Sequence, residues 1–447
     1  MDMSFIVRHS NELKGVGAEV FRAACSIEWI REILGGLQRR RRFFDATTTG
    51  LIFLGQTLSP DRSCRNAIAL ARASGLLSAK ASVHTGAYCQ ARERLPEDAL
   101  HSVATQLGVE LMNAERPKDR WHGRRVVVVD GSTVSLPDTA ANQAQYPQPS
   151  AQAVGCGFPV MYVCALMSLA SGALLDFATG GGAGNELALW RQLWPLLRPG
   201  DIALGDGLYC GYADLVLLRA RGVDGVMRLK RRKTDFRKGR IFGVLDHLTV
   251  WRSPKQPPAW LGVQVLPAEL SVRELRFRVE VPGFRAEMVT LVTTLTDAEV
   301  YSKEDLAGLF FQRWQVEMRL RDIKITLGMD TLRATTPVRA RKELWMHLAG
   351  YNVLRTLMCA AAQKAGVPVA RISFQGCRQR LLAAASRRGT TRTFRSLYRR
   401  LLRDLGKDQN PDRPLRIEPR ATKRRLKQYD LMIRPRAVMR KALMKVA

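Results

Sequence analysis

The sequence has no closely spaced cysteine pair, few acidic side chains for its basic content, and no apolar core at its start. Its eight cysteines form no Cys-x-x-Cys motif and are scattered along 447 residues, so zinc is not expected. Such thiols are typical of small buried residues in a reducing cytosol. The opening "MDMSFIVRHSNELKG" lacks a signal-peptide core, which argues against export. We therefore expect a cytoplasmic protein.

One uncharged stretch, residues 139–175, is long enough to suggest a membrane span. It is interrupted by Pro147, Pro149 and Pro159 and by a Ser171-Gly172 pair. Prolines and glycines at these places suit a loop followed by a strand hairpin better than a spanning helix. The sequence therefore predicts no membrane association.

Positive charge dominates the composition. Lys plus Arg number 71 against 40 Asp plus Glu, which gives a net charge of +31 and a pI near 10.6. A charge of this size favours binding to polyanions, because basic side chains that neutralise phosphates release counterions. Ribosomal and other RNA-binding proteins have similar charge, but 46% hydrophobic residues indicate large packed cores. The length predicts about two or three domains.

The first 118 residues have helical periodicity, with breaks at "TLSPDRS" and "ERLPED". The segments "SCRNAIALARASGLL" and "TGAYCQARERLPEDALHSVATQLGVELM" carry basic faces. A basic helical module is a candidate for DNA binding, although plain helical packing explains such a pattern at least as often. We interpret residues 1–118 as a helical DNA-binding domain.

Two short apolar segments each end in Asp-Gly. Four valines run into Asp130 in "VVVVDGS", and "DIALGDGLYCG" places Asp206 after another apolar run. These patterns predict buried strands of one sheet with a carboxylate at the end of each strand. Asp-Gly also commonly forms turns, so either aspartate alone is weak evidence of a site.

A later segment, "FFQRWQVEMRLRDIK", has charged residues within an apolar helical stripe. Ser302 and Asp305 predict a capping box at the helix start, and Gly328 predicts its end. The stripe contains Leu306, Leu309, Phe310, Val316, Leu320, Ile323 and Leu327. A second apolar stripe predicts burial on two sides: Phe311, Trp314, Met318 and Ile325.

Three charges, Arg313, Glu317 and Lys324, lie within the first stripe. Arg313 and Glu317, four residues apart, suit a structural salt bridge. The other hypothesis is that Glu317 joins Asp130 and Asp206 in a triad. Three carboxylates would repel one another without a cation, and Mg²⁺ prefers oxygen ligands and bridges carboxylates to phosphate.

With these residues the chain resembles bacterial insertion-sequence transposases with an Asp-Asp-Glu triad. The branch it resembles has a Tyr-x2-Arg-x3-Glu-x6-Lys helix signature; here Phe310 replaces the tyrosine and the other spacings are kept. "FLGQTLSPDRSC", "AYCQARERLP", "GYNVLR" and "KRRLKQYDLMIRPR" also resemble this family, over nearly the whole chain.

The resemblance implies an α/β ribonuclease-H-like catalytic core and cut-and-paste DNA transposition. It implies two Mg²⁺ or Mn²⁺ ions on Asp130, Asp206 and Glu317, with Arg313 and Lys324 contacting DNA phosphates. The partners it implies are double-stranded DNA, as terminal inverted repeats and target DNA, and a second subunit in a synaptic complex. The expected location is the nucleoid in the cytoplasm.

Between Asp206 and Glu317 lie 110 residues, more than one helix and one strand require. The alternating "ELRFRVEVPG" predicts a β-rich insertion, which the resembled branch also has. In that family a tryptophan near the end of the insertion can hold a flipped base, whereas Trp251 and Trp260 lie earlier here. We therefore predict four further parts after the helical domain. Residues 119–230 form the first part of the core and 231–285 the insertion. Residues 286–365 form the second part of the core with the Glu317 helix, and 366–447 a basic C-terminal region.

The C-terminal region is rich in Lys and Arg. "RQRLLAAASRRG" and "TFRSLYRRLLRDL" predict helices, and "PRATKRRLKQYDLMIRPRAVMRK" a looser tail for phosphate contact or for solvation alone. Besides a transposase, two functions stay open from the sequence. One is a nuclease with the same core but without strand transfer, and the other is a noncatalytic basic DNA-binding protein.

Overall fold

The computed structural model describes most of the chain. The described residues are 32–34, 43–78, 80–182, 186–230, 232–279, 287–385, 391–411 and 432–446.

The chain forms two compact units. One, here called the helical unit, comprises residues 1–114 and 320–412, and the other, the sheet unit, comprises 115–319 and 413–447. Each unit is described by itself. The five-part domain organisation expected from the sequence stays a prediction.

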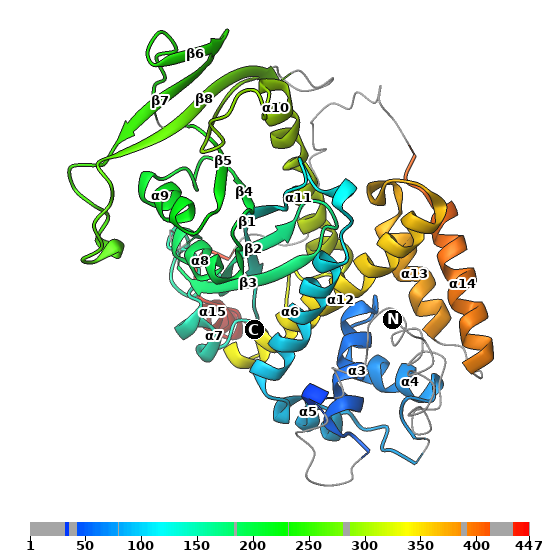
Figure 1. Ribbon diagram of the computed structural model, residues 1–447. Helices are drawn as coiled ribbons and strands as arrows, with labels where there is room; N and C mark the ends of the chain where they lie inside the picture. Colours follow the sequence, from blue (N-terminus) through cyan, green and yellow to red (C-terminus); the bar gives the residue numbers. More distant parts are fainter. Residues whose placement is uncertain are drawn as a thin grey trace. The chain divides into compact units, whose positions relative to one another are not determined.

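The sheet unit is built on one nine-stranded mixed sheet with the order β3-β2-β1-β4-β5-β9-β8-β7-β6 (Figure 1). The strands are β1 (Val126–Ser135), β2 (Val160–Ser168), β3 (Leu174–Gly181), β4 (Ile202–Gly205), β5 (Asp224–Arg228), β6 (Arg240–Gly243), β7 (Asp246–Arg252), β8 (Glu269–Val279) and β9 (Glu287–Thr293).

The centre of this sheet is parallel and its flanks are antiparallel. β1 pairs in parallel with β4, and β4 with β5, whereas β2, β3 and β6–β9 join by antiparallel pairing. Helix α8 (Glu186–Gln192) packs on β2 and β3, and α9 (Tyr212–Ala220) on β5 (Figure 1). The buried valines of β1 and all of β4 therefore form the core of the sheet.

The prediction that the first strand ends at Asp130 is wrong. β1 continues to Ser135, because β2 pairs with its second half, from Asp130 opposite Ala165 to Ser135 opposite Val160. The strand expected before Asp206 is confirmed, since β4 ends at Gly205.

The uncharged stretch forms the predicted loop and hairpin. A short helix, α7 (Ala140–Gln145), precedes β2, and the turn between β2 and β3 contains Gly172 with a φ of 71°. Within the described ranges, no helix combines the length and the apolar character that crossing a membrane requires.

The segment that carries Glu317 is helical in three successive parts. They are α10 (Lys303–Gln312), α11 (Trp314–Arg321) and a π-helical turn (Asp322–Thr326). The predicted capping box of Ser302 and Asp305 is present, and Gly328, with a φ of 72°, follows the last turn. Every residue of the first apolar stripe is buried.

The predicted burial on the opposite flank is wrong. Its four side chains are 41–64% exposed: Phe311, Trp314, Met318 and Ile325. Helical periodicity identifies an apolar face but does not tell whether another element covers it. This helix is therefore covered on one side only.

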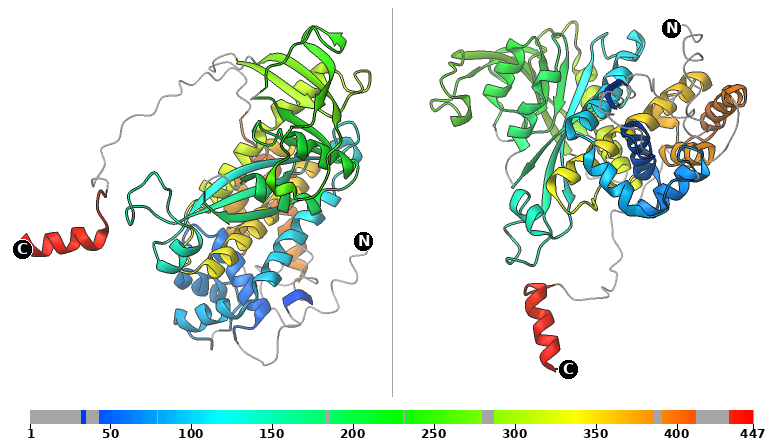
Figure 2. Two further views of the ribbon diagram at one scale, coloured as in Figure 1. Left: turned by 90° about the vertical axis from the view of Figure 1, so that its left-hand side faces the viewer. Right: turned by 90° about the horizontal axis from the view of Figure 1, so that it is seen from below.

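The helical unit contains helices and no extended strand among its described residues. Figure 2 shows these helices from two further sides, blue to cyan and yellow to orange. They are α3 (Ala46–Leu58), α4 (Cys64–Ala73), α5 (Thr85–Arg94), α6 (Glu97–Asn113), α12 (Pro337–Ala365), α13 (Phe374–Ala385) and α14 (Thr391–Lys407).

Helix α12 is the centre of the helical unit and contacts α3, α6, α13 and α14. The helices predicted before residue 118 and after 371 are confirmed where they are described. The sequence predicts a looser tail near the C-terminus. The last part of this segment is helical instead, because it belongs to α15 (Arg436–Val446). Residues 412–431 of that tail lie outside the described residues.

Candidate active site

Asp130 lies in β1, and Asp206 directly follows the neighbouring strand β4. β1 and β4 run in parallel with Val128 opposite Leu204. Two residues further along each chain stand Asp130 and Asp206, so this register brings the two aspartates level. Neighbouring strands are about 4.8 Å apart. The sheet thus brings together two acidic residues that are 76 positions apart in the sequence.

A glycine follows each aspartate, and neither glycine has the positive φ of a turn. A Cβ at Gly131 would overlap the Glu186 carboxylate, and a Cβ at Gly207 would lie 2.6 Å from Cγ of Lys230. Each glycine therefore leaves room for a charged side chain next to the aspartate. The Asp-Gly pairs serve close approach at these positions.

Glu317 is held at the site by the anchoring of its helix. Arg319, which is 7% exposed, donates to the backbone oxygens of Ser168 at 2.9 Å and Leu169 at 2.7 Å, in the turn after β2. Val316 in the same helix is fully buried. α11 is thereby fixed to the end of the β2–β3 hairpin.

Glu317 forms the ion pair that its spacing with Arg313 suggests. Nη2 of Arg313 lies 3.1 Å from Oε1 of Glu317. The Glu317 side chain is 41% exposed and the Arg313 side chain 13%. The prediction that Glu317 is buried is therefore wrong, because it lies at the edge of the first stripe, next to the exposed Trp314 and Met318.

Asp130 has an unusual electrostatic environment. Its carboxylate receives a hydrogen bond from the Gly131 N–H at 3.1 Å, but it makes no ion pair with any described residue. Burial raises the pKa of Asp130 to about 6; the charge of Arg313 opposes this rise, and the charges of Glu317 and Glu186 add to it. The site therefore leaves Asp130 short of positive charge.

Asp206 has the opposite balance. Burial is the largest single influence and would raise its pKa, but several lowering influences together outweigh it, first among them a hydrogen bond from Nζ of Lys230 at 2.8 Å. The Leu208 N–H, at 2.7 Å, and the charge of Arg313 act in the same direction. The pKa of Asp206 is thus held below its ordinary value, and its carboxylate is ionised at neutral pH.

Glu186 is a fourth carboxylate of this group, which the sequence analysis did not identify. It accepts a hydrogen bond from the hydroxyl of Tyr209, a fully buried side chain. Burial and the neighbouring Cys164 and Glu186 raise the pKa of Tyr209, so the hydroxyl keeps the proton that it donates. In the sequence, Glu186 is an acid in the first turn of a helix, which is common and gives no functional signal.

The four carboxylates of the site face two cations. Asp130, Asp206, Glu186 and Glu317 are accompanied by Arg313 and Lys230. Oxygen donors with surplus negative charge suit a hard divalent cation. As their side chains are oriented here, however, no three His, Cys, Asp or Glu residues of the described ranges form a group ready to hold a metal ion.

Three other residues considered from the sequence have different environments. Lys324 lies in the π-helical turn, which belongs to the helical unit. Trp251 is 3% exposed and donates to Glu274 at 2.6 Å, whereas Trp260 is 42% exposed under the guanidinium of Arg191. Of the two tryptophans, Trp260 alone presents a ring surface.

Comparison with known proteins adds a family. Residues 121–353 match the family model described as "Transposase DDE domain". The transposase InsG for insertion sequence element IS4 of Escherichia coli (strain K12) is 28% identical over 288 residues, which cover 63% of this chain and 62% of that protein. The transposase for insertion sequence element IS231B of Bacillus thuringiensis subsp. berliner is 25% identical over 213 residues, 47% of this chain and 43% of that protein.

The chain thus spans about three fifths of the IS4 relative and less than half of the IS231B relative. One solved structure, a piggyBac transposase synaptic complex with hairpin DNA, has a TM-score of 0.44 and 12% identity and covers 88% of this chain and 86% of that one. The family model covers more than half of the chain and includes Asp130, Asp206 and Glu317. The chain therefore belongs to the transposase DDE domain family.

Proposed function

We propose that this chain is a DNA transposase that cleaves DNA strands at transposon ends and transfers these ends to target DNA. The observation that carries the proposal is the group of carboxylates around Asp130, inside the segment that matches the family model. A cluster with surplus negative charge is costly to maintain in a fold, and it is common where a protein performs chemistry.

Asp130, Asp206 and Glu317 are the proposed catalytic residues and metal ligands. Transposase DDE domain proteins use divalent metal ions, and the proposed cofactor is a pair of Mg²⁺ or Mn²⁺ ions. Such ions would activate an attacking water or 3′ hydroxyl and stabilise the leaving oxygen. Asp206 would exchange its ion pair with Lys230, and Glu317 its ion pair with Arg313, for contact with an ion. Asp130 has no ion pair to break among the described residues.

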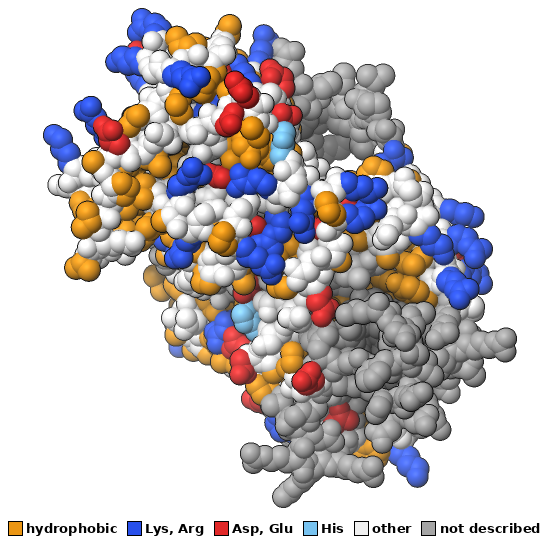
Figure 3. All heavy atoms as spheres, viewed as in Figure 1, with side chains coloured by type: hydrophobic (Ala, Val, Ile, Leu, Met, Phe, Trp, Pro, Cys, Tyr) orange, Lys and Arg blue, Asp and Glu red, His pale blue; other side chains and the backbone are white. Residues whose placement is uncertain are grey.

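Arg313 and Lys324 are the proposed contacts to DNA phosphates. With Glu317 they keep the spacing of the Tyr-Arg-Glu-Lys branch, and Phe310 occupies the tyrosine position. When Glu317 turns away, the Arg313 guanidinium would be available for a phosphate, which it binds through two parallel hydrogen bonds. Figure 3 shows Lys and Arg side chains over much of the described surface in that view, which supports a polyanionic partner.

The remaining proposals concern the fold and the assembly. We propose that β3-β2-β1-β4-β5 is a ribonuclease-H-like core, supported by its two central strands that carry the aspartates. The β6, β7 and β8 strands would be the insertion within 231–285. The proposed substrate is double-stranded DNA with terminal inverted repeats, bound by two subunits in the cytoplasm at the nucleoid.

The test uses DNA that flanks the gene and carries short inverted repeats. We expect wild-type protein with Mg²⁺ or Mn²⁺ to nick this DNA and to join the cut end to a target plasmid. Asp130→Asn, Asp206→Asn and Glu317→Gln should each lower cleavage by about 10³-fold or more, which corresponds to ~4 kcal/mol of transition-state stabilisation, while binding to the DNA is kept.

The outcomes of this test separate the other functions. Cleavage without joining would favour a nuclease, and binding without cleavage a noncatalytic DNA-binding protein. Retained cleavage in any one variant would remove that residue from the triad.

A further inference from the structure

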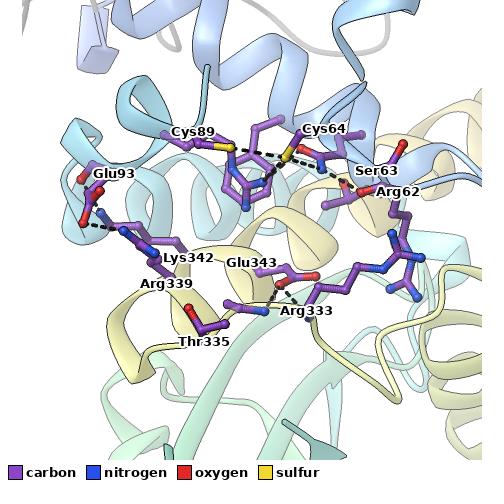
Figure 4. A pocket seen from close by; sticks show the side chains of 15 residues that line it. Arg62, Ser63, Cys64, Cys89, Glu93, Arg333, Thr335, Arg339, Lys342 and Glu343 are labelled. Atoms are coloured by element: carbon purple, nitrogen blue, oxygen red, sulfur yellow. Dashed lines mark hydrogen bonds and ion pairs between the residues drawn. The ribbon is translucent and has the colours of Figure 1, made fainter. Parts of the chain in front are cut away.

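Two thiols face each other in the wall of a cavity in the helical unit. Sγ of Cys64, the first residue of α4, and Sγ of Cys89 in α5 are 3.7 Å apart. Figure 4 shows the two sulfurs joined by a dashed line at one side of the cavity. The cavity has a volume of about 310 Å³ and is strongly basic, with Arg62, Arg92, Arg333, Arg339 and Lys342 in its lining.

The Cys64 sulfur accepts hydrogen bonds from three directions. Nε2 of Gln56 and Nη1 of Arg92 each lie 3.6 Å from it, and the thiol of Cys89 is the third donor. Cys64 also begins a ten-residue helix whose first free N–H groups lie at this end. A cation, an amide donor and a helix start all stabilise negative charge on a sulfur, so Cys64 has the surroundings of a nucleophilic thiolate.

Cys89 is the protonated partner of Cys64. Burial raises the pKa of Cys89, and the neighbouring Cys64 sulfur raises it further, so Cys89 keeps its proton and donates it toward Cys64. Its side chain is exposed, whereas Cys64 is half-buried. The arrangement places the Cys64 sulfur, which is surrounded by donors, next to a protonated thiol that can move toward it.

We propose that Cys64 and Cys89 form a reversible disulfide when the protein meets hydrogen peroxide. The Cys64 thiolate attacks one peroxide oxygen, the O–O bond breaks, and the other oxygen leaves as hydroxide and takes a proton to become water. Cys64 is now a sulfenic acid. The Cys89 sulfur attacks the Cys64 sulfur, releases its proton, and displaces the hydroxyl as a second water. Two thiols are oxidised, and one peroxide is reduced to two waters.

The bond would join α4 to α5, which already pack against each other. A disulfide is about 2.05 Å long, so the sulfurs approach by less than 2 Å, a movement within reach of side-chain rotation. Closing the loop between residues 64 and 89 restricts the unfolded chain and stabilises the helical unit. This oxidation is independent of the proposed transposase activity, because no DNA and no carboxylate takes part in it.

The experiment is a peptide map of the full chain after treatment with hydrogen peroxide and alkylation of the remaining thiols. Trypsin releases Cys64 in residues 63–65 and Cys89 in residues 81–92. We expect these two peptides to be joined, with the loss of two alkylable thiols, and to separate after dithiothreitol. Cys156 and Cys210, which are half-buried, are the internal controls and should stay alkylable.

Two variants assign the roles. In Cys89→Ser, we expect the sulfenic acid to persist on Cys64 and to react with dimedone; in Cys64→Ser, Cys89 should remain a thiol. The proposal is overturned if the wild-type map shows no joined peptide. It is also overturned if Cys156 and Cys210 oxidise as fast as Cys64, or if Cys89 is the residue labelled by dimedone. The wild-type map decides the main point even if a variant does not fold.

Discussion

Aspartates in the sheet unit that are buried or partly buried fall into two groups with opposite surroundings. Asp246 is held by both nitrogens of the Arg273 fork, at 2.8 Å and 2.5 Å, and Asp201 is held by Arg125 in the same way. Asp130, on the central strand, has no ion pair within the described ranges and has two glutamates nearby instead.

The difference shows that the fold pairs the carboxylates that have a structural role. Arginine is abundant in this basic chain, and Asp214 and Asp224 are also bound by arginines. A buried charge without a partner costs several kcal/mol, so a fold selected for stability alone would pair or remove it. We infer that Asp130 is left unpaired because an ion joins it during function.

The largest expected effect is a difference of sign between two matched substitutions. Asp246→Asn should lower the free energy of unfolding by about 3–5 kcal/mol, because it leaves the guanidinium of Arg273, 1% exposed, without its charge partner. Asp130→Asn should raise it by about 1–3 kcal/mol, because it removes a partly buried charge of raised pKa. Urea unfolding at neutral pH with a chelator would measure both. A loss of stability in Asp130→Asn equal to that in Asp246→Asn would end the comparison.

A smaller effect is expected in the pH dependence of the free energy of unfolding, to which the Asp130 carboxyl contributes. Its pKa is about 6 in the folded chain against 3.8 ordinarily, so between these values the folded chain holds a proton that the unfolded chain has released. The free energy of unfolding therefore falls as the pH rises through this window, and the penalty is fully present above about pH 6. Below about pH 4 it vanishes.

Unfolding of the wild type and of Asp130→Asn, measured from about pH 4 to 7 without metal, would test this window. The stability advantage of the variant should be near zero at the acid end and grow toward neutral pH. An advantage that does not change with pH would show that the Asp130 carboxyl does not titrate in this window.

Arg313 should have an intermediate effect. It is close enough to lower the pKa of both Asp130 and Asp206, and it pairs with Glu317. Arg313→Ala should therefore raise the pKa of Asp130 further and lower DNA cleavage by about 10–100-fold, the range for residues that support metal ligands. Arg313→Lys, which keeps the charge, is the matched control and should retain more activity.

The structural-salt-bridge hypothesis for Arg313 gives the reverse result. In that case Arg313→Ala and Glu317→Gln would lower the melting temperature by similar amounts, and the folded fraction of each would cleave DNA normally. Measuring melting temperature and cleavage on the same samples separates the two hypotheses.

The smallest effect is expected at Phe310. Its ring is 9% exposed and lies 5.6 Å from the Arg313 guanidinium. Phe310→Tyr restores the residue of the family signature, and we expect stability within about 1 kcal/mol of the wild type and unimpaired cleavage. A severe loss of cleavage in a folded Phe310→Tyr protein would show that this chain does not follow the signature at that position.

The sequence predicts the backbone of the site better than its electrostatics. The apolar runs before Asp130 and Asp206 predict buried strands because hydrophobic patterning is a local property. The capping box at Ser302 is local too. In contrast, Lys230 and Glu186 come close to the aspartates only because β5 and α8 fold onto the sheet. The spacing of these residues in the sequence does not predict that they are neighbours.

The three wrong predictions have the same origin. The end of β1 depends on pairing with β2, and the exposure of the second apolar stripe and of Glu317 depends on whether another element covers that side of the helix. Both are tertiary properties. The glycines beside the aspartates were the one signal of close neighbours in the sequence, but Asp-Gly also suits a turn, and the pattern alone does not separate the two uses.

The most direct test of the central claim is calorimetric titration of Mn²⁺ into the wild type, Asp130→Asn and, as a matched control, Glu304→Gln, whose carboxylate stands in the first turn of α10. The unpaired Asp130 carboxylate predicts binding to the wild type and to Glu304→Gln, and loss of that binding in Asp130→Asn. Identical isotherms for all three proteins would contradict the account, because Asp130 would then be a buried acid without a metal to hold.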